Sequence, residues 1–167
     1  MKRVFAVVIL FMMHGSAGGG EVMERLHFLL GEWALEYQIP KSSMSEAMTG
    51  SGQGVMRRAL HNKYITFDYH CSLGGDTTEA HGIFRWDESR QIYRYWWFES
   101  SGAYDTATCK LVDDGTLYMN WHGSVLRQTF KKMSDQEVFL LMELPVSDGS
   151  YELVLKVIMK RMEELSD

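Results

Sequence analysis

The chain has 167 residues, of which 46% are hydrophobic and 13% aromatic, and its formal net charge is -5. This length and composition suit one globular domain with a single core, and they exclude a disordered chain. The negative charge makes the phosphate backbone of a nucleic acid an unfavourable partner. Fifteen glycines against two prolines favour many strands joined by glycine-containing turns.

The first seventeen residues have the layout of a secretory signal peptide. A Lys-Arg pair precedes the apolar run VFAVVILFMM, and the small residues of HGSA stand before a cleavage point. The run is too short to cross a membrane as a helix, and no cysteine follows for a lipid anchor. We therefore expect a signal peptide at 1–17, a mature chain from Gly18, and a secreted or periplasmic protein. The alternative is a start at Met23, which would leave the protein in the cytoplasm.

The next segment predicts a short helix followed by strands. Apolar residues recur at helical spacing over 21–30, and Gly31 ends the pattern. From Trp33 onward the period is two, and turn sequences such as DDG and SDG separate the runs. We expect strands at 33–39, 53–60, 63–71, 79–87, 91–99, 104–112, 115–122, 125–132, 136–144 and 150–160. The predicted fold is all-β with one short N-terminal helix, an antiparallel up-and-down sheet closed into a barrel that leaves no exposed edge.

The segment IYRYWWFE, residues 92–99, carries aromatic rings on both faces of its strand. Alternation gives two rows, the first Tyr93, Tyr95, Trp97 and Glu99, the second Ile92, Arg94, Trp96 and Phe98. Tyrosine and tryptophan rings facing a barrel interior would give apolar walls with a few polar tips, which is the usual chemistry of a small-molecule site. We expect the first row to line a cavity with Glu99 near its mouth. The second row would be covered by the helix or by a second subunit, which would make a homodimer. A barrel filled by side chains, with no cavity, is the alternative.

Two stretches resemble known families. LLGEW, a short helix followed by Gly-x-Trp, resembles the opening of lipocalin-like calycins, and HGIFRWDESRQIYRYWWFESSG resembles the central signature of the bacterial family named domain of unknown function 1579. The later LRQTF also fits, so the resemblance covers most of residues 22–160. It implies a single lipocalin-like barrel over 18–167 with no established catalytic residues. The lipocalin resemblance further implies that Trp33 packs under Arg161 and closes one end of the barrel by a cation–π contact.

Other residues give weaker indications of a ligand or metal site. An arginine facing into a barrel needs a carboxylate or an anionic ligand, so Arg127 is a candidate ligand-binding residue; an outward position for it and for Arg94 is the alternative. His70, His81 and His122 lack close metal-ligand spacing. We therefore expect no metal and no cofactor, with a zinc or heme site between these strands as a minor alternative. GSGQG lacks the Lys-Ser/Thr of a phosphate loop, and its glycines are expected to bend a strand.

These observations together favour binding over catalysis. We expect the barrel to bind a small, largely apolar molecule in its interior, with no nucleic-acid partner and no membrane anchor. One alternative is a barrel enzyme that uses Glu99 with a histidine or an arginine on a small polar substrate. Another is a structural or interaction module with a filled barrel. Cys71 and Cys109 are either two buried free thiols or a disulfide formed in an oxidising compartment.

Overall fold

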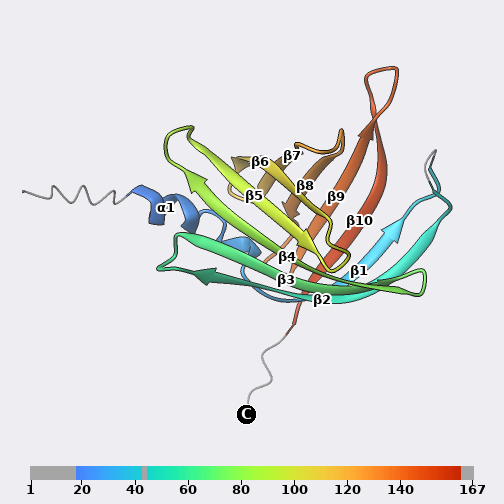
Figure 1. The fold of residues 1–167 in the computed structure, drawn as a ribbon, viewed down its shortest axis with the longest axis horizontal. Coiled ribbons are helices and arrows are strands. Elements are labelled where there is room, and N and C mark those ends of the chain that lie inside the picture. Colours follow the sequence, from blue (N-terminus) through green and yellow to red (C-terminus); the bar gives the residue numbers. More distant parts are fainter. Residues whose placement is uncertain (1–17, 43–44, 163–167) are drawn as a thin grey trace, which may run out of the picture.

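The computed structural model describes residues 18–42 and 45–162, so the expected signal peptide lies outside the described residues. Ten strands form a closed antiparallel barrel in which each strand pairs with its neighbours in sequence and the first pairs with the last (Figure 1). They are β1 (Gly31–Ile39), β2 (Met48–Ala59), β3 (Tyr64–Leu73), β4 (Asp76–Asp87), β5 (Ile92–Glu99), β6 (Tyr104–Asp113), β7 (Thr116–Trp121), β8 (Arg127–Lys132), β9 (Glu137–Pro145) and β10 (Tyr151–Arg161). The predicted all-β, up-and-down, lipocalin-like barrel is confirmed.

Alternation along each strand builds the core. On β5, Tyr93 and Tyr95 are 2% and 3% exposed, whereas Phe98 on the opposite face is 45% exposed. The same period of two buries Phe67 on β3 and Met119 on β7. Burying one face of every strand removes apolar surface from water, and this supplies most of the free energy that holds such a barrel together.

Two short helical segments close one end of the barrel: α1 (Gly18–Glu24) and the 3₁₀ helix η1 (His27–Leu29). The predicted single helix at 21–30 is therefore wrong in its extent. Between the two segments the backbone makes tighter bonds, from the Leu26 amide to the Met23 carbonyl and from the Leu29 amide to the Leu26 carbonyl. This winding lets Met23, Leu26 and Leu29 all bury their side chains in the core.

Trp33 and Arg161 join the first and last strands beside this closed end. They are direct partners in the β1–β10 register. Trp33 is fully buried and donates its indole N–H to the Leu29 carbonyl oxygen at 2.8 Å. The guanidinium carbon of Arg161 lies 4.5 Å from the centre of the indole ring, and Nη1 donates to the Leu30 carbonyl at 2.8 Å. Gly31 has a φ of +128°, and a side chain there would overlap Nη1 of Arg161, so glycine is required at this position.

β2 begins at Met48, five residues before the predicted start at 53. The missed segment is rich in glycine, a residue with low strand propensity, so its pattern does not indicate a strand. The structure shows what these glycines allow. A Cβ on Gly52 would overlap the carbonyl oxygen of His70, and one on Gly50 would overlap that of Ser72. Glycine therefore lets β2 lie close against β3.

Cys71 and Cys109 are both buried and free. Cys71 lies on β3 and Cys109 on β6, strands separated by β4 and β5 in the barrel order. Burial raises the pKa of the Cys109 thiol above its ordinary value. Of the two alternatives from the sequence, the structure therefore has two buried thiols that pack as small hydrophobic side chains.

Within residues 18–42 and 45–162, neither helical segment has the length and hydrophobicity that a membrane span requires.

Candidate functional site

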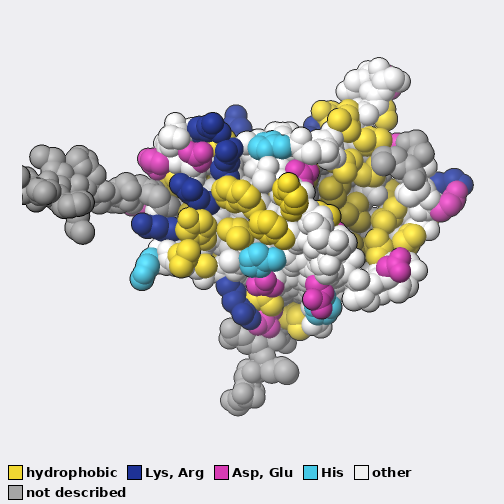
Figure 2. All heavy atoms as spheres, viewed as in Figure 1, with side chains coloured by type: hydrophobic (Ala, Val, Ile, Leu, Met, Phe, Trp, Pro, Cys, Tyr) yellow, Lys and Arg dark blue, Asp and Glu magenta, His cyan; other side chains and the backbone are white. Residues whose placement is uncertain are grey.

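A cavity of about 210 Å³ lies inside the barrel. It occupies the half of the interior away from α1, and Figure 2 shows hydrophobic side chains in the hollowed region below the β9–β10 hairpin. The cavity is lined by side chains of eight strands and of the β7–β8 connection: Leu35, Tyr37, Phe67, Tyr69, Tyr95, Trp97, Asp105, Trp121, Ser124, Leu126, Gln128, Phe130, Leu140, Met142, Leu155, Val157 and Met159.

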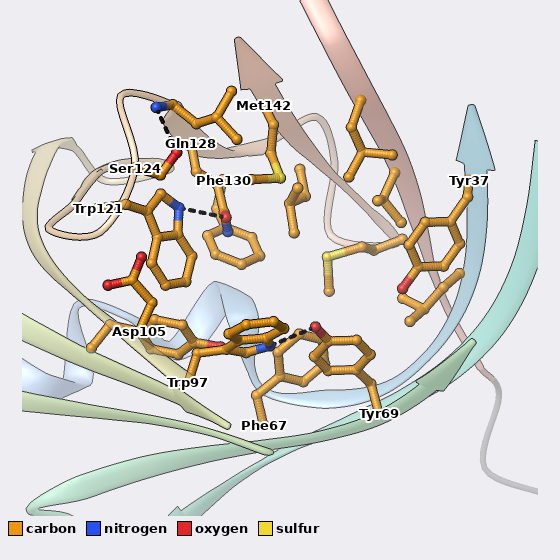
Figure 3. Close-up of a pocket in the computed structure, with 17 residues that line it drawn as sticks. Tyr37, Phe67, Tyr69, Trp97, Asp105, Trp121, Ser124, Gln128, Phe130 and Met142 are labelled. Atoms are coloured by element: carbon orange, nitrogen blue, oxygen red, sulfur yellow. Dashed lines mark hydrogen bonds between the residues drawn. The ribbon is translucent and has the colours of Figure 1, made fainter. Parts of the chain in front are cut away.

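The cavity has an aromatic wall and an aliphatic wall (Figure 3). Trp121 meets both β5 rings edge-on, with its ring centre 5.7 Å from that of Tyr95 and 6.2 Å from that of Trp97. The aliphatic wall is built by β1, β9 and β10, and its members include Leu140 and Leu155. This edge-to-face arrangement is a favoured geometry for aromatic pairs, and it joins the three rings into one wall.

Glycines on neighbouring strands make room for these rings. Gly82 on β4 is the direct partner of Trp97 on β5, and a Cβ at Gly82 would overlap the phenol of Tyr95. A Cβ at Gly54 on β2 would lie 2.6 Å from Cε2 of Phe67. The rings thus lie flat over bare backbone instead of extending across the barrel. The space left in the middle is the cavity.

Most polar tips in the cavity are paired with one another. Trp97 donates its indole N–H to the Tyr69 hydroxyl at 2.9 Å, and Trp121 donates to Oε1 of Gln128 at 3.2 Å. Burial raises the pKa of Tyr69 to about 12, and it also raises the pKa of Tyr37 and of Tyr95 above the ordinary value. These phenols are therefore neutral near pH 7, and this part of the cavity is apolar with a few neutral hydrogen-bonding groups.

Asp105 is the charged member of the lining, at the start of β6. Its Oδ1 accepts hydrogen bonds from the amide of Thr106 at 2.7 Å and from the amide of Gly123 at 3.0 Å. Since Gly123 lies just after β7, these bonds hold the carboxylate against the loop at the rim of the cavity. The Asp105 carboxylate therefore places one negative charge among the aromatic rings at the rim.

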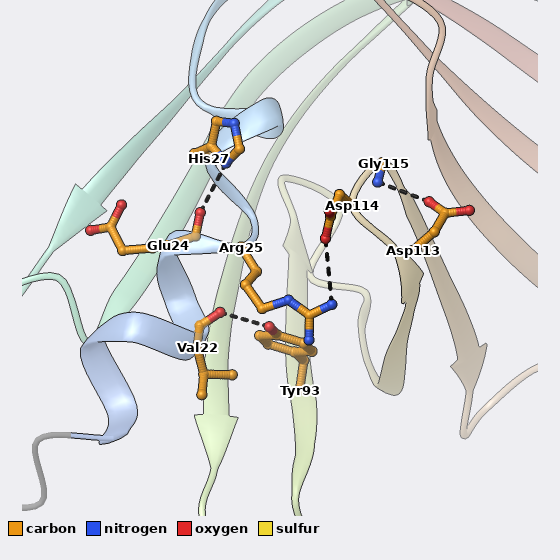
Figure 4. Close-up of polar contacts among 8 residues, drawn as sticks. All are labelled: Val22, Glu24, Arg25, His27, Tyr93, Asp113, Asp114 and Gly115. Atoms are coloured by element: carbon orange, nitrogen blue, oxygen red, sulfur yellow. Dashed lines mark hydrogen bonds and ion pairs between the residues drawn. The ribbon is translucent and has the colours of Figure 1, made fainter.

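The first row of β5, which is expected to face inward, has its four residues in three different surroundings. Tyr95 and Trp97 line the cavity. Tyr93 also points inward, but its hydroxyl donates to the Val22 carbonyl of α1 at 2.7 Å (Figure 4), so it packs in the closed end and not on the cavity wall. Glu99 ends β5, where it accepts a hydrogen bond from Oγ of Ser101 at 2.9 Å. Glu99 is also absent from the lining, and its expected place at the mouth is taken by Asp105.

Arg127 lies on the outer wall, so its expected place in a ligand site inside the barrel is corrected. Its Nη2 donates to Oε2 of Glu143 at 2.8 Å, and its guanidinium carbon lies 3.7 Å from the centre of the Tyr151 ring. The hydrogen bond that Arg127 donates to Glu143 raises the pKa of Arg127. Arg94 is likewise outside, 3.7 Å from Asp87. The outward alternative for both arginines therefore holds.

The outer row of β5 is not covered by the N-terminal helix. Phe98 is 45% exposed, while α1 and η1 pack their apolar side chains into the core at the barrel end. Helix cover of this row is therefore wrong for Phe98. Cover of Trp96 and Phe98 by a second subunit remains a prediction.

The strand histidines do not meet inside the barrel. Nδ1 of His81 lies 2.5 Å from Oδ1 of Asp68, a pair that is 42% and 61% exposed, and Nδ1 of His122 lies 2.8 Å from Oγ1 of Thr106. In the part of the chain that the structure describes, no three His, Cys, Asp or Glu residues are grouped to hold a metal ion.

Comparisons with known proteins support the fold and nothing finer. No model of a protein family matches the chain, and no curated protein matches it. Rv2717c from M. tuberculosis is similar in structure, with a TM-score of 0.59 and 12% identity over 84% of this chain and 97% of that chain. The S-type phycobiliprotein lyase CPES from Guillardia theta has a TM-score of 0.52 and 9% identity over 86% of this chain and 92% of that chain. The resemblance to the domain of unknown function 1579 family stays a prediction.

Proposed function

We propose that this protein binds a small, largely apolar molecule inside its barrel. The cavity of about 210 Å³ between an aromatic and an aliphatic wall carries this proposal. A dry cavity of about 150 Å³ lined by apolar side chains binds benzene, whereas drug-sized ligands occupy roughly 300–1,000 Å³. A molecule of one or two rings, or one with a short branched chain, suits the space between these limits.

The size of the cavity argues against the alternative of a filled barrel. Protein interiors are close-packed, and few voids exceed the size of a water molecule. Apolar side chains that line such a space lack packing partners on one side and forfeit dispersion energy. A ligand that fills the space would recover part of that energy, because each buried ligand carbon regains dispersion contacts with the wall.

Binding also fits the residues better than catalysis does. The enzyme alternative needs Glu99 to meet a histidine or an arginine in the cavity, but neither Glu99 nor Arg127 lines it. Among the described residues that line the cavity there is no histidine, lysine, arginine or cysteine, and no hydrogen bond joins Ser124 to Asp105. They therefore offer no nucleophile paired with a base. The lyase named among the similar structures shares 9% identity, and that likeness supports a common barrel and not a common reaction.

The proposal for the compartment rests on the sequence. We propose that the barrel acts outside the cytoplasm, because the segment before Gly18 has the order of a signal peptide. Since the described residues of the cavity lining include no arginine or lysine, the ligand is expected to be held by shape and apolar contact, with hydrogen bonds as a secondary contribution.

A pair of matched variants tests the binding site. Leu140 lines the cavity, and Leu141 is its neighbour on the opposite face of β9. Leu140→Trp should fill the cavity and weaken the affinity for naphthylmethanol, a neutral apolar probe, by about tenfold or more. Leu141→Trp should leave the affinity within about twofold of the wild type. Isothermal titration calorimetry measures both, with circular dichroism to confirm folding.

The same pair separates the alternatives. If the barrel were filled, Leu140→Trp would overpack the core and cost about 1–3 kcal/mol, and the wild type would not bind the probe.

Trp97→Ala and Trp96→Ala form a second pair on the two faces of β5, and the first should change affinity more. The opposite ranking would place the ligand on the outer face. Native mass spectrometry of protein purified from its own source would then show whether a ligand is carried with it.

A further inference from the structure

The rim of the cavity brings one carboxylate and two indole rings together. Asp105 on β6 is the direct cross-strand partner of Trp97 on β5, so their Cβ atoms are neighbours on the inner face. Trp121 stands next to both, with its ring centre 6.2 Å from that of Trp97 and an angle of 77° between the rings. Figure 3 shows the Asp105 carboxylate beside these two indoles, all three pointing into the same space.

The carboxylate of Asp105 is held in place but is not neutralised by a basic side chain. The amide of Gly123 approaches both oxygens, at 3.0 and 3.3 Å, and a Cβ on Gly123 would lie 2.9 Å from Oδ2. The amide of Thr106 gives a further bond at 2.7 Å. Among residues 18–42 and 45–162, no ion pair involves Asp105. A carboxylate has about four acceptor positions, so Asp105 keeps acceptor capacity for a ligand.

The charge at the rim selects the sign of the ligand. Among the described residues that line the cavity, Asp105 alone is charged, and its charge is negative. A ligand that carried a carboxylate or phosphate at this end would be repelled, and the whole-chain charge of -5 has the same sign. The faces of indole rings attract cations, most strongly where water is excluded. An ammonium group would gain from both the carboxylate and the indoles.

We propose that the ligand is an organic ammonium ion, an apolar body carrying a protonated amine, with the amine at Asp105, Trp97 and Trp121. This inference rests on the proposed binding function and names the chemical class of its ligand. The body lies between the aromatic wall and Leu140, and the amine points to the rim, where water can still reach part of it. The cavity thus combines apolar burial with recognition of one positive charge.

Three ligands with the same ring system test this inference. Naphthylmethylammonium is positive, naphthylmethanol neutral and naphthoate negative, so apolar burial is nearly constant while the charge changes. We expect the wild type to bind the ammonium about tenfold or more tighter than the alcohol, and naphthoate most weakly. The preference for the ammonium should shrink as salt is raised, because the rim is partly exposed.

Asp105→Asn is the deciding variant, because asparagine keeps the shape and can still accept from the Gly123 amide. It should bring the ammonium-to-alcohol ratio to within about twofold of one, chiefly by weakening the binding of the ammonium. Glu99→Gln is the matched control, since it removes the same charge from the end of β5 without touching the lining; its ratio should equal that of the wild type.

The outcomes are distinguishable. If the wild type binds the alcohol as tightly as the ammonium, or if Asp105→Asn keeps the full ratio, this inference is overturned while the proposed binding function stands. If Glu99→Gln lowers the ratio as much as Asp105→Asn does, general attraction to an acidic protein explains the preference and the inference is again overturned. If none of the three ligands binds, the proposed function fails and this inference with it. The salt series on the wild type needs no variant, so a folding defect in Asp105→Asn does not prevent a decision.

Discussion

Replacing Trp33 with alanine should remove the residue that ties the closed end of the barrel together. The indole is fully buried, its N–H bonds to the Leu29 carbonyl at 2.8 Å, and the Arg161 guanidinium lies 4.5 Å from its centre. Loss of a buried tryptophan costs about 3–5 kcal/mol. The cation–π contact is worth roughly 0.5–2 kcal/mol and an orphaned carbonyl about 1–3 kcal/mol, but these contributions overlap. We expect a total loss of about 4–5 kcal/mol.

The assay is urea unfolding followed by far-UV circular dichroism, because fluorescence would change with the loss of the tryptophan itself. A domain of this kind has a free energy of unfolding of about 5–15 kcal/mol, so the predicted loss is a large fraction of it. Trp33→Phe keeps an aromatic ring but not the N–H and should lose about 1–3 kcal/mol. Trp96→Ala, on the outer face of β5, is the control and should lose about 1 kcal/mol. A loss below 1 kcal/mol for Trp33→Ala would refute the role given to this end of the barrel.

Three further predictions concern the backbone, the tyrosines and the N-terminus. Gly31→Ala should cost about 1–3 kcal/mol in the same unfolding assay, because its φ of +128° is unfavourable for alanine; a neutral effect would contradict this. Four of the eight tyrosines have a raised pKa, Tyr69 to about 12, so stability should be complete below pH about 10 and fall as the pH rises toward 12. Tyrosinate absorbance should show these four ionising only as circular dichroism reports unfolding, and early ionisation of all eight would contradict it. N-terminal sequencing of the exported protein should begin at Gly18, since a Lys-Arg pair, an apolar run and small residues precede it in the order of a signal peptide; a start at Met1 or Met23 would contradict this.

Much of the barrel could be predicted because its signals are local. Turn sequences such as DDG and SDG and the period of two along each strand place nine of the ten expected strands near the observed ones, and closure follows from the cost of exposed edges. β2 begins five residues earlier than predicted, at Met48. A glycine-rich strand lacks the side chains that give a pattern of alternation. Its glycines are needed for close contact with β3, and a contact between two strands cannot be predicted from the sequence of one of them.

The site could be predicted only along one strand. Alternation on β5 predicts that Tyr93, Tyr95 and Trp97 all face inward. It does not show where along the barrel axis the cavity begins, so it does not separate Tyr93, at the closed end, from the two residues that line the cavity. Trp121 and Asp105 come from other strands, and their proximity to Trp97 depends on register, which no single sequence reveals. The outward position of Arg127 could have been predicted from β8. Residues an odd number of positions apart on a strand face opposite sides, and Phe130, three positions after Arg127, faces the core.

An NMR titration of the wild type with naphthylmethanol, followed through side-chain methyl groups, tests the binding of a ligand inside the barrel most directly. Methyl signals of Leu140 and Met142, which line the cavity, should shift together and saturate as a single site. Those of Leu141 and Ile158, on the outer faces of β9 and β10, should stay in place. Shifts confined to Leu141 and Ile158, or no saturable shift at Leu140 and Met142, would contradict binding in the interior.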